Sequence, residues 1–292
     1  MIESKPWDGV SRFESFMAQI ETPHRQEALF YTRKWLIQAV AAVYLLEGLS
    51  AAGMLVLTGP QGIGKTWFIR QLASRVPNGF LEGATLDPSN KDSVMTIASH
   101  WIVELGELDA TFRKSDLAQL KAFITKRVDK FRRPYAKKDS EFGRRTVMAG
   151  TVNDPEFLYD NTGNRRFWVI QVDAIHIDQS IDIQQLWAEA KTWYDAGETW
   201  HLNQQEQLSL NQHNAQFEVV DPVSEKIQIK FDFQNMTKTT WLTATRIAEI
   251  ALFDRPTKGE VQRVSTVVRG LNGNQAKRVG GNRLLCVPGV HL

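Results

Sequence analysis

The distribution of apolar and polar residues predicts alternating strands and helices over the first 172 residues. Four short runs rich in Val, Ile, Leu or Trp suit strands that are buried on both faces. They are Met54–Leu57, Trp101–Leu105, Arg145–Ala149 and Phe167–Val172. Helical spacing of apolar residues predicts helices between them, over Trp67–Val76, Ser93–Ser99 and Ser115–Arg127. This alternation indicates an α/β fold with a parallel sheet and crossover helices.

Helical patterns flank this region on both sides. Residues 1–50 are predicted to form an N-terminal helical segment, because apolar residues between Phe30 and Leu46 recur at roughly helical spacing. After Val172, helices are expected over Ile183–Ala196 and Gln204–Phe217, where they would form a lid.

The last part of the chain has the pattern of a helix–turn–helix. A break is expected at Asp221-Pro222, followed by helices over Thr243–Leu252 and Glu260–Leu271. A hairpin of residues 278–287 around Gly280-Gly281-Asn282 would make the unit winged. The expected organisation is therefore an N-terminal segment (1–50), an α/β core (51–200), and a helical lid with a winged-helix-like C-terminal domain (201–292).

The strongest chemical signal follows the first predicted strand. It is a phosphate-loop pattern formed by Gly59, Pro60, Gln61, Gly62, Ile63, Gly64, Lys65 and Thr66. Without side chains at its glycines, the backbone can curl and direct N–H groups at phosphate oxygens, next to a helix N-terminus. Lys65 would reach the β- and γ-phosphates of ATP, and the Thr66 hydroxyl would ligate Mg²⁺. Strand, loop and helix signals agree, which distinguishes this segment from a chance Gly-rich turn.

Acidic residues at the end of the Trp101–Leu105 strand fit the same chemistry. If this strand lies beside the phosphate loop, Glu104 would hold the metal and Glu107 would polarise the attacking water. The alternative for both residues is a solvated acidic loop, and Asp109 fits that alternative better.

Two further polar positions complete the predicted ATPase site. Asn153 follows the third strand and is interpreted as a sensor of the γ-phosphate, the alternative being a turn residue before Asp154-Pro155. Arg165 or Arg166 is interpreted as an arginine finger supplied across a subunit boundary, because Arg presents a planar fork of donors. The alternative for the arginines is a surface ion pair or a contact to nucleic acid.

Composition restricts the remaining possibilities. The chain has 292 residues and a formal net charge of +2, so any nucleic-acid surface must be local. The only cysteine is Cys286, which excludes a disulfide scaffold and a Cys-based zinc site within one chain. No apolar stretch is long enough to span a bilayer, and no signal-peptide pattern is found, so a cytoplasmic protein without membrane contact is expected.

The densest group of cations lies between the acidic strand and the Asn153 strand. It includes Lys126, Arg127, Lys130, Arg132, Arg133, Lys137, Lys138, Arg144 and Arg145. Cations bind phosphates and aromatic rings such as Tyr135 stack on bases, so this segment is a candidate contact for single-stranded DNA. A solvated basic face is the alternative.

Seven short segments between residues 7 and 172 share their order and residue types with one known family. They are Trp7–Arg12, Gly59–Thr66, Trp101–Leu108, Leu120–Phe123, Phe131–Tyr135, Gly150–Asn153 and Phe157–Phe167. Together they resemble the virulence-associated protein E family of phage and mobile-element proteins, which belongs with the superfamily 3 helicases. The part beyond about Phe217 lies outside this resemblance, and Ala51-Ala52-Gly53 is a less familiar entry to the phosphate loop.

The resemblance implies a P-loop NTPase core of the AAA+ type. It also implies that the chain assembles as a homo-oligomeric ring, which is expected to be a hexamer. It implies ATP-driven movement along single-stranded DNA in a bacterial cell or phage-infected host. It also implies that Lys121 and the Arg133–Lys138 region contact DNA, the latter as a pore hairpin. Relatives often carry a primase module ahead of the helicase, and there is no room for one before Trp7. Priming is therefore expected either to be done by a separate primase or replication protein, which would be a partner, or to be absent.

The resulting hypothesis is an ATP-dependent DNA helicase or translocase for replication of a phage or mobile element. Two alternatives remain. One is an ATP-gated initiator or loader that binds duplex DNA with little unwinding. The other is a small-molecule phosphotransferase built on the same loop, against which the basic segment and the paired arginines argue.

Overall fold

The computed structural model describes residues 1–106, 108, 116–131, 140–158, 164–219, 221–251 and 255–289. The chain forms two compact units, Met1–Glu218 and Val219–Leu292. The boundary expected between residues 200 and 201 is therefore wrong, and residues 1–50 are part of the first unit rather than a separate segment. Each unit has its own apolar core.

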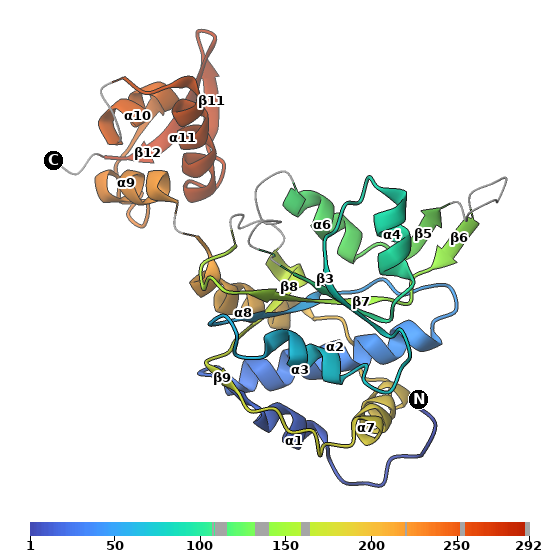
Figure 1. Ribbon diagram of the computed structural model, residues 1–292. Helices are drawn as coiled ribbons and strands as arrows, with labels where there is room; N and C mark the ends of the chain where they lie inside the picture. The colour runs from blue at the N-terminus through green and yellow to red at the C-terminus, as the bar shows by residue number, and fades with distance from the viewer. Residues whose placement is uncertain are drawn as a thin grey trace. The chain divides into compact units, whose positions relative to one another are not determined.

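A five-stranded parallel sheet forms the centre of the first unit (Figure 1). Its strands are β2 (Met54–Thr58), β3 (Phe80–Ala84), β4 (Ile102–Leu105), β7 (Val147–Val152) and β8 (Phe167–Gln171). Their order across the sheet is β3-β4-β7-β2-β8, and every neighbouring pair is parallel. The prediction of a central parallel sheet with helices is confirmed, and β3 is an additional edge strand that the apolar pattern did not indicate.

Helices cover both faces of this sheet. In the view of Figure 1, α4 (Lys91–Ala98) and α6 (Asp116–Ile124) lie above it, while α2 (Arg25–Tyr44) and α7 (Ile183–Asp195) lie below. α2 contacts three of the strands and packs along α7. Its Trp35, Leu36 and Val40 are buried, as the helical spacing predicts, but the helix ends at Tyr44 and Leu46 is 81% exposed.

The helix after the phosphate loop is shorter than predicted. α3 spans Lys65–Gln71 rather than Trp67–Val76. Beyond it the backbone bonds change to the tighter i−3 type, from the Leu72 N–H to the Ile69 carbonyl and from the Ala73 N–H to the Arg70 carbonyl. The helix therefore ends in a series of turns that lead into the edge strand β3.

The helices expected to form a lid belong to the body of the first unit. α7 carries buried Leu186, Trp187 and Ala190, and α8 (Gln204–Asn214) is followed by a 3₁₀ turn (Ala215–Phe217). Buried side chains of α8 tie it to β8: His213 Nε2 lies 2.9 Å from the Val169 carbonyl oxygen, and Asn214 donates to the Phe167 carbonyl. Burial lowers the pKa of His213. This long-range bonding holds α8 against the edge strand β8.

The basic segment contains two strands that pair as an antiparallel hairpin. β5 (Val128–Phe131) pairs with β6 (Ser140–Gly143), and residues 132–139 between them lie outside the described part of the chain. A buried ion pair anchors the base of this hairpin, where Arg144 donates from Nε to Asp129 Oδ2 at 2.8 Å. The Arg144 guanidinium also donates to the Phe123 carbonyl and lies 4.0 Å from the centre of the Phe123 ring on α6.

The second unit is a small α/β structure with the predicted pair of helices and a hairpin. Its elements are α9 (Pro222–Lys230), β10 (Thr239–Thr243), α10 (Ala244–Ala251), α11 (Lys258–Leu271), β11 (Ala276–Val279) and β12 (Asn282–Pro288). The strands form an antiparallel sheet in the order β10-β12-β11. Asp221-Pro222, expected as a break, is instead the start of α9: Asp221 accepts from the Val223 N–H, and Pro222 occupies the first turn.

Within the described residues, none of the helices combines the length and the apolar character required to cross a membrane.

Candidate functional site

The predicted phosphate loop connects the carboxyl end of β2 to α3. Gly62 and Gly64 have φ values of +83° and +97°, in the left-handed region that glycine adopts most readily. Gly59 is required for a different reason, since a Cβ there would lie 2.0 Å from the Val172 carbonyl oxygen. Pro60, Gln61 and the remaining loop positions therefore follow a curl that only glycine allows at these three points.

The Lys65 side chain is buried within this curl. Its ammonium donates to the Gly59 carbonyl at 2.6 Å, the Pro60 carbonyl at 2.8 Å and Asn153 Oδ1 at 3.0 Å. Lys65 is only 6% exposed, so its positive charge is held in place at the carboxyl edge of the sheet. An anion at this edge would meet a fixed cation together with the N–H groups of the loop.

Glu104 on β4 lies beside Thr66 of the loop. Its carboxylate is 2% exposed and accepts from the Thr66 hydroxyl at 3.2 Å and the Thr151 hydroxyl at 2.7 Å. The Gly83 N–H donates to its second oxygen at 2.7 Å. These three donors hold the carboxylate in one orientation, facing the Thr66 hydroxyl in the first turn of α3.

In the sheet, β7 lies between the Glu104 strand β4 and the phosphate-loop strand β2. The end of the Glu104 strand nevertheless lies beside the phosphate loop, as the sequence predicts, because Glu104 contacts Thr66. The hydroxyls of Thr66 and of Thr151 on β7 donate to the same oxygen of Glu104, so its side chain extends across β7 to the loop.

Asn153 lies where it was predicted, directly after β7, and its amide oxygen accepts from Lys65. Thr151, two residues earlier, was not singled out, although side chains alternate along a strand and residues 151 and 153 share a face. That period of two, together with Glu104 on the neighbouring strand, is the signal that could have identified Thr151. The main-chain contribution of Gly83 has no sequence signal of this kind.

The paired arginines lie at the amino ends of the strands, whereas the phosphate loop lies at their carboxyl ends. Met54 is level with Phe167 and Thr58 with Gln171 in the β2–β8 pairing, so Arg165 and Arg166 precede the amino end of β8. The phosphate loop follows the carboxyl end of β2, about 16 Å away along a strand of five residues. Arg165 and Arg166 therefore do not reach the phosphate loop of their own chain.

The environment of the two arginines differs. Arg165 is exposed and donates to Gln207 at 3.5 Å. Arg166 is half-buried, with its Nε enclosed, and burial together with the charge of Arg165 lowers the pKa of its guanidinium. A pocket of about 260 Å³ lies beside them, lined also by Ser50, Thr125 and His201.

The structure corrects part of the predicted DNA surface. Lys121 on α6 is only 7% exposed, with its ammonium 5.9 Å from the centre of the Phe167 ring, so it is not a surface contact. Lys130 is exposed and forms a 2.5 Å cross-strand ion pair with Glu141, which raises the pKa of Lys130. The predicted residues Glu107, Arg132, Arg133, Tyr135, Lys137 and Lys138 lie outside the described part of the chain.

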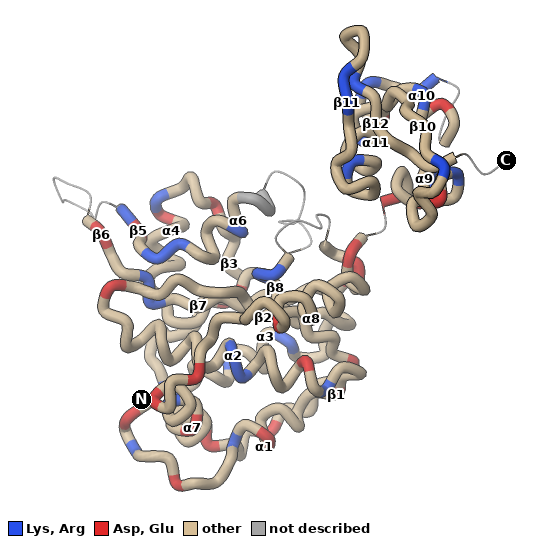
Figure 2. The backbone as a smooth tube through the Cα atoms, turned by 180° about the vertical axis from the view of Figure 1, so that it is seen from behind, with Lys and Arg blue, Asp and Glu red and all other residues tan. Residues whose placement is uncertain are grey.

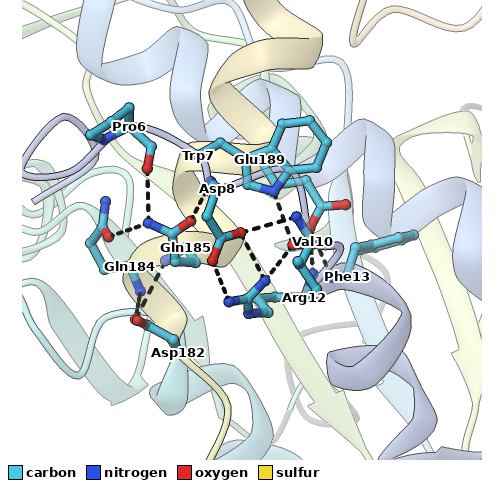
Figure 3. A network of polar contacts seen from close by, with 10 residues as sticks. All are labelled: Pro6, Trp7, Asp8, Val10, Arg12, Phe13, Asp182, Gln184, Gln185 and Glu189. Carbon is cyan, nitrogen blue, oxygen red and sulfur yellow. Dashed lines mark hydrogen bonds and ion pairs between the residues drawn. The ribbon is translucent and has the colours of Figure 1, made fainter.

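The segment Trp7–Arg12 is fixed to α7 by side chains that sequence reasoning missed (Figure 3). Gln185 accepts from the Asp8 N–H at 2.9 Å and donates to the Pro6 carbonyl at 3.0 Å. Arg12 pairs with Asp8 at 2.6 Å, and their hydrogen bonds lower the pKa of Asp8 and raise that of Arg12. Because the partners are about 177 residues apart in the chain, no local pattern indicates them.

Glu189 of α7 supplies the cap of the short helix α1 (Phe13–Ala18). Its carboxylate, 4% exposed, accepts from the backbone N–H groups of Arg12 at 2.7 Å and Phe13 at 3.0 Å. α1 in turn places Phe16 against Phe68 of α3, with ring centroids 4.4 Å apart. The N-terminal segment thereby braces the helix that begins at Lys65.

Removing the Glu189 carboxylate is expected to destabilise α1 and its packing against α3. Glu189→Ala leaves the buried Phe13 N–H and the part-buried Arg12 N–H without their acceptor, which should lower the free energy of unfolding by about 2–4 kcal/mol. Urea unfolding followed by tryptophan fluorescence measures it. Glu14→Ala, at an exposed position of α1, is the matched control and should change stability by less than about 0.5 kcal/mol. Equal stability of the two variants would contradict the capping role.

Known proteins resemble this chain both in a family model and in fold. Residues 2–219 match the model of the virulence-associated protein E-like domain. Among solved structures, "The A form apo structure of NrS-1 C terminal region-CTR" has a TM-score of 0.54 at 14% identity and covers 99% of this chain and 78% of that chain. "The A form apo structure of NrS-1 C terminal region-CTR(305-718)" gives 0.56 at 14% identity, covering 98% and 77%. At that identity the likeness concerns the fold alone.

No curated protein matches the chain. The family match covers the first unit except for Met1 and ends beside its boundary with the second unit. It includes all the segments that carry the resemblance. The chain belongs to the virulence-associated protein E-like family.

Proposed function

We propose that this protein is an ATP-hydrolysing DNA helicase or translocase that acts in replication of a phage or mobile element. Its core would be a P-loop NTPase of the AAA+ type, assembled as a ring of identical chains. One observation carries the proposal: Lys65, Thr66, Glu104 and Asn153, from three separate segments, meet at the carboxyl edge of a parallel sheet. That edge is where ligands bind in open α/β folds.

The residues present suit a magnesium–triphosphate ligand. Among the described residues, no group of three or more His, Cys, Asp or Glu side chains is placed to hold a metal. Mg²⁺ does not need one, because it is usually bound by one or two protein oxygens and by substrate phosphates. The Thr66 hydroxyl and the Glu104 carboxylate supply such oxygens, 3.2 Å apart. Bound there, the ion would neutralise charge that develops on the phosphates.

The chain's own residues would divide the remaining work. The loop N–H groups and the Lys65 ammonium orient the phosphates, and Asn153 reports the γ-phosphate through its contact with Lys65. Glu107 is proposed to polarise the attacking water. Arg165 or Arg166 would complete the site of a neighbouring subunit, since about 16 Å of strand separates them from their own phosphate loop.

ATP turnover with and without single-stranded DNA tests the proposal, alongside a measurement of particle size. A motor should hydrolyse ATP, respond to single-stranded DNA, and form a larger particle when nucleotide or DNA is present. ATP turnover that ignores DNA and phosphorylates a soluble acceptor would favour a small-molecule phosphotransferase instead.

A shared site makes a further prediction about mixtures. Lys65→Ala and the double variant Arg165→Ala/Arg166→Ala should each be inactive alone, because each removes one half of every interface. Mixed at equal ratio, they should recover up to about one quarter of wild-type turnover, the share of interfaces that receive two intact halves. A mixture of Lys65→Ala with Glu104→Gln, both on the same half, is the control and should recover nothing. No recovery in the first mixture would contradict the shared site.

A further inference from the structure

The excess of positive over negative charge in this protein lies in the second unit. Residues 219–292 contain eleven Lys and Arg against six Asp and Glu, whereas residues 1–218 contain 24 against 27. The whole net charge of +2 is therefore due to the smaller unit. Local excess of this kind is the electrostatic footprint of a nucleic-acid-binding surface.

The hairpin of β11 and β12 carries part of this charge in an unusual arrangement. Arg278 and Arg283 face each other directly across the two strands, and both are exposed. Like charges in directly opposite positions destabilise a hairpin. The neighbouring Lys277 lies on the other face of the strand, with its ammonium 4.2 Å from the centre of the Trp241 ring. The hairpin thus holds a cationic pair that a bound anion would relieve (Figure 2).

The outer half of this hairpin does not serve the core. Leu285 and Val287 of β12 are buried in the core of the second unit, but residues 276–283 are all exposed. Gly280 and Gly281 turn the chain at φ values of +56° and +82°, and the neighbouring Val279 is 55% exposed. The tip is therefore a projecting element whose residues are not explained by folding.

The outward face of α11 has a composition that suits base contacts. Val264 and Val268 are buried, whereas Lys258, Gln262 and Thr266 follow one another at intervals of four on the exposed side. The stripe contains no acidic residue. The nearby Glu260 carboxylate accepts from the Thr257 N–H in the capping box of α11. Lys, Gln and Thr are side chains that read base edges in the major groove, which is wide enough to admit a helix.

We infer that the second unit is a duplex-DNA-binding module of the winged-helix kind. The stripe Lys258–Gln262–Thr266 of α11 enters the major groove, and the β11–β12 hairpin contacts backbone phosphates through Arg278 and Arg283. The order of elements, with one helix and strand, two further helices and a terminal hairpin, is consistent with this assignment. The inference does not depend on ATP hydrolysis in the first unit, and it adds a duplex contact to the single-strand contacts proposed there.

The test measures anisotropy of a fluorescein-labelled 24-base-pair duplex with the full chain, without nucleotide, between 50 and 300 mM KCl. Arg278→Ser/Arg283→Ser should weaken duplex binding at least tenfold at 100 mM salt. It should also lower the slope of log affinity against log salt by about 2, one for each lost phosphate contact. Because the two arginines repel each other, their removal should leave the melting temperature unchanged or raise it, so unfolding would not account for the loss.

Arg246→Ser is the matched control, since Arg246 is an exposed cation of the same unit that is paired with Glu249 at 3.0 Å. It should leave the salt slope within about 0.3 of the wild-type value. An unchanged slope in the double variant would overturn the proposal. So would an equal loss of affinity for the single strand of the same length, because that result would place the arginines in a general single-strand site.

The helix contact is tested separately by Gln262→Ala/Thr266→Ala. In affinity selection from a random duplex pool, this variant should lose the sequence preference of the wild type while keeping its salt slope. An unaltered selected sequence would exclude α11 from base contact.

Discussion

Replacing Lys65 with alanine is expected to reduce ATP turnover by about 10²–10³-fold, which corresponds to about 3–4 kcal/mol of transition-state stabilisation. The ammonium is held by two loop carbonyls and by Asn153, at distances of 2.6 to 3.0 Å, so it is positioned before any phosphate arrives. A preorganised cation stabilises developing charge without further rearrangement. Steady-state phosphate release, measured with and without single-stranded DNA, gives the effect.

Two variants separate charge from structure. Arg75→Ala removes an exposed cation just beyond α3 and should leave turnover within about twofold of wild type. Lys65→Arg keeps the charge, but its planar guanidinium cannot satisfy the same three acceptors, so only a small part of the activity should return. Wild-type turnover in Lys65→Ala would mean that the loop does not bind the reacting phosphates.

Arg144→Ala is expected to lower the free energy of unfolding of the first unit by about 3–5 kcal/mol. The substitution leaves the fully buried Asp129 carboxylate without its guanidinium partner, and the ammonium of Lys126 lies 3.5 Å away from it. It also removes the bond to the Phe123 carbonyl that ties the β5–β6 hairpin to α6. Eight of the nine tryptophans lie in residues 1–218, so urea unfolding followed by tryptophan fluorescence reports on this unit.

The same hairpin supplies the control. Lys130 and Glu141 form an exposed ion pair, with side chains 65% and 63% exposed, and Lys130→Ala should cost less than about 1 kcal/mol. Replacing both members of the buried pair, as in Asp129→Leu/Arg144→Met, should cost less than Arg144→Ala alone, because no charge is left buried. A loss below about 1 kcal/mol in Arg144→Ala would show that the ion pair does not anchor the hairpin.

The parts of the fold that were predictable are those that the chain encodes locally. The central strands are buried on both faces, so their apolar runs stand out, and the loop after β2 combines a strand, glycines and a helix start. The edge strand β3 was missed because it is half exposed and interrupted by Gly83. The β5–β6 hairpin was not indicated by periodicity because the residues that hold its base, Asp129 and Arg144, are buried charges.

The candidate site was predictable to the extent that its residues end strands or belong to the phosphate loop. Lys65, Thr66, Glu104 and Asn153 meet as predicted, although β7 separates the strands of Glu104 and Thr58. Lys121 was assigned to DNA from a family resemblance, and only the three-dimensional structure shows that it is buried. Glu189 could not have been found, because its partners at residues 11–13 come together with it only through folding.

The placement of the arginines and the phosphate loop on opposite edges of one sheet has a consequence for dosage. If catalysis needs the phosphate loop of one protomer and the arginines of another, an isolated protomer is inactive. Specific activity then rises with protein concentration until assembly is complete. A host that carries few copies of the protein would then be spared wasteful ATP consumption, and expression above the assembly threshold would itself switch the enzyme on.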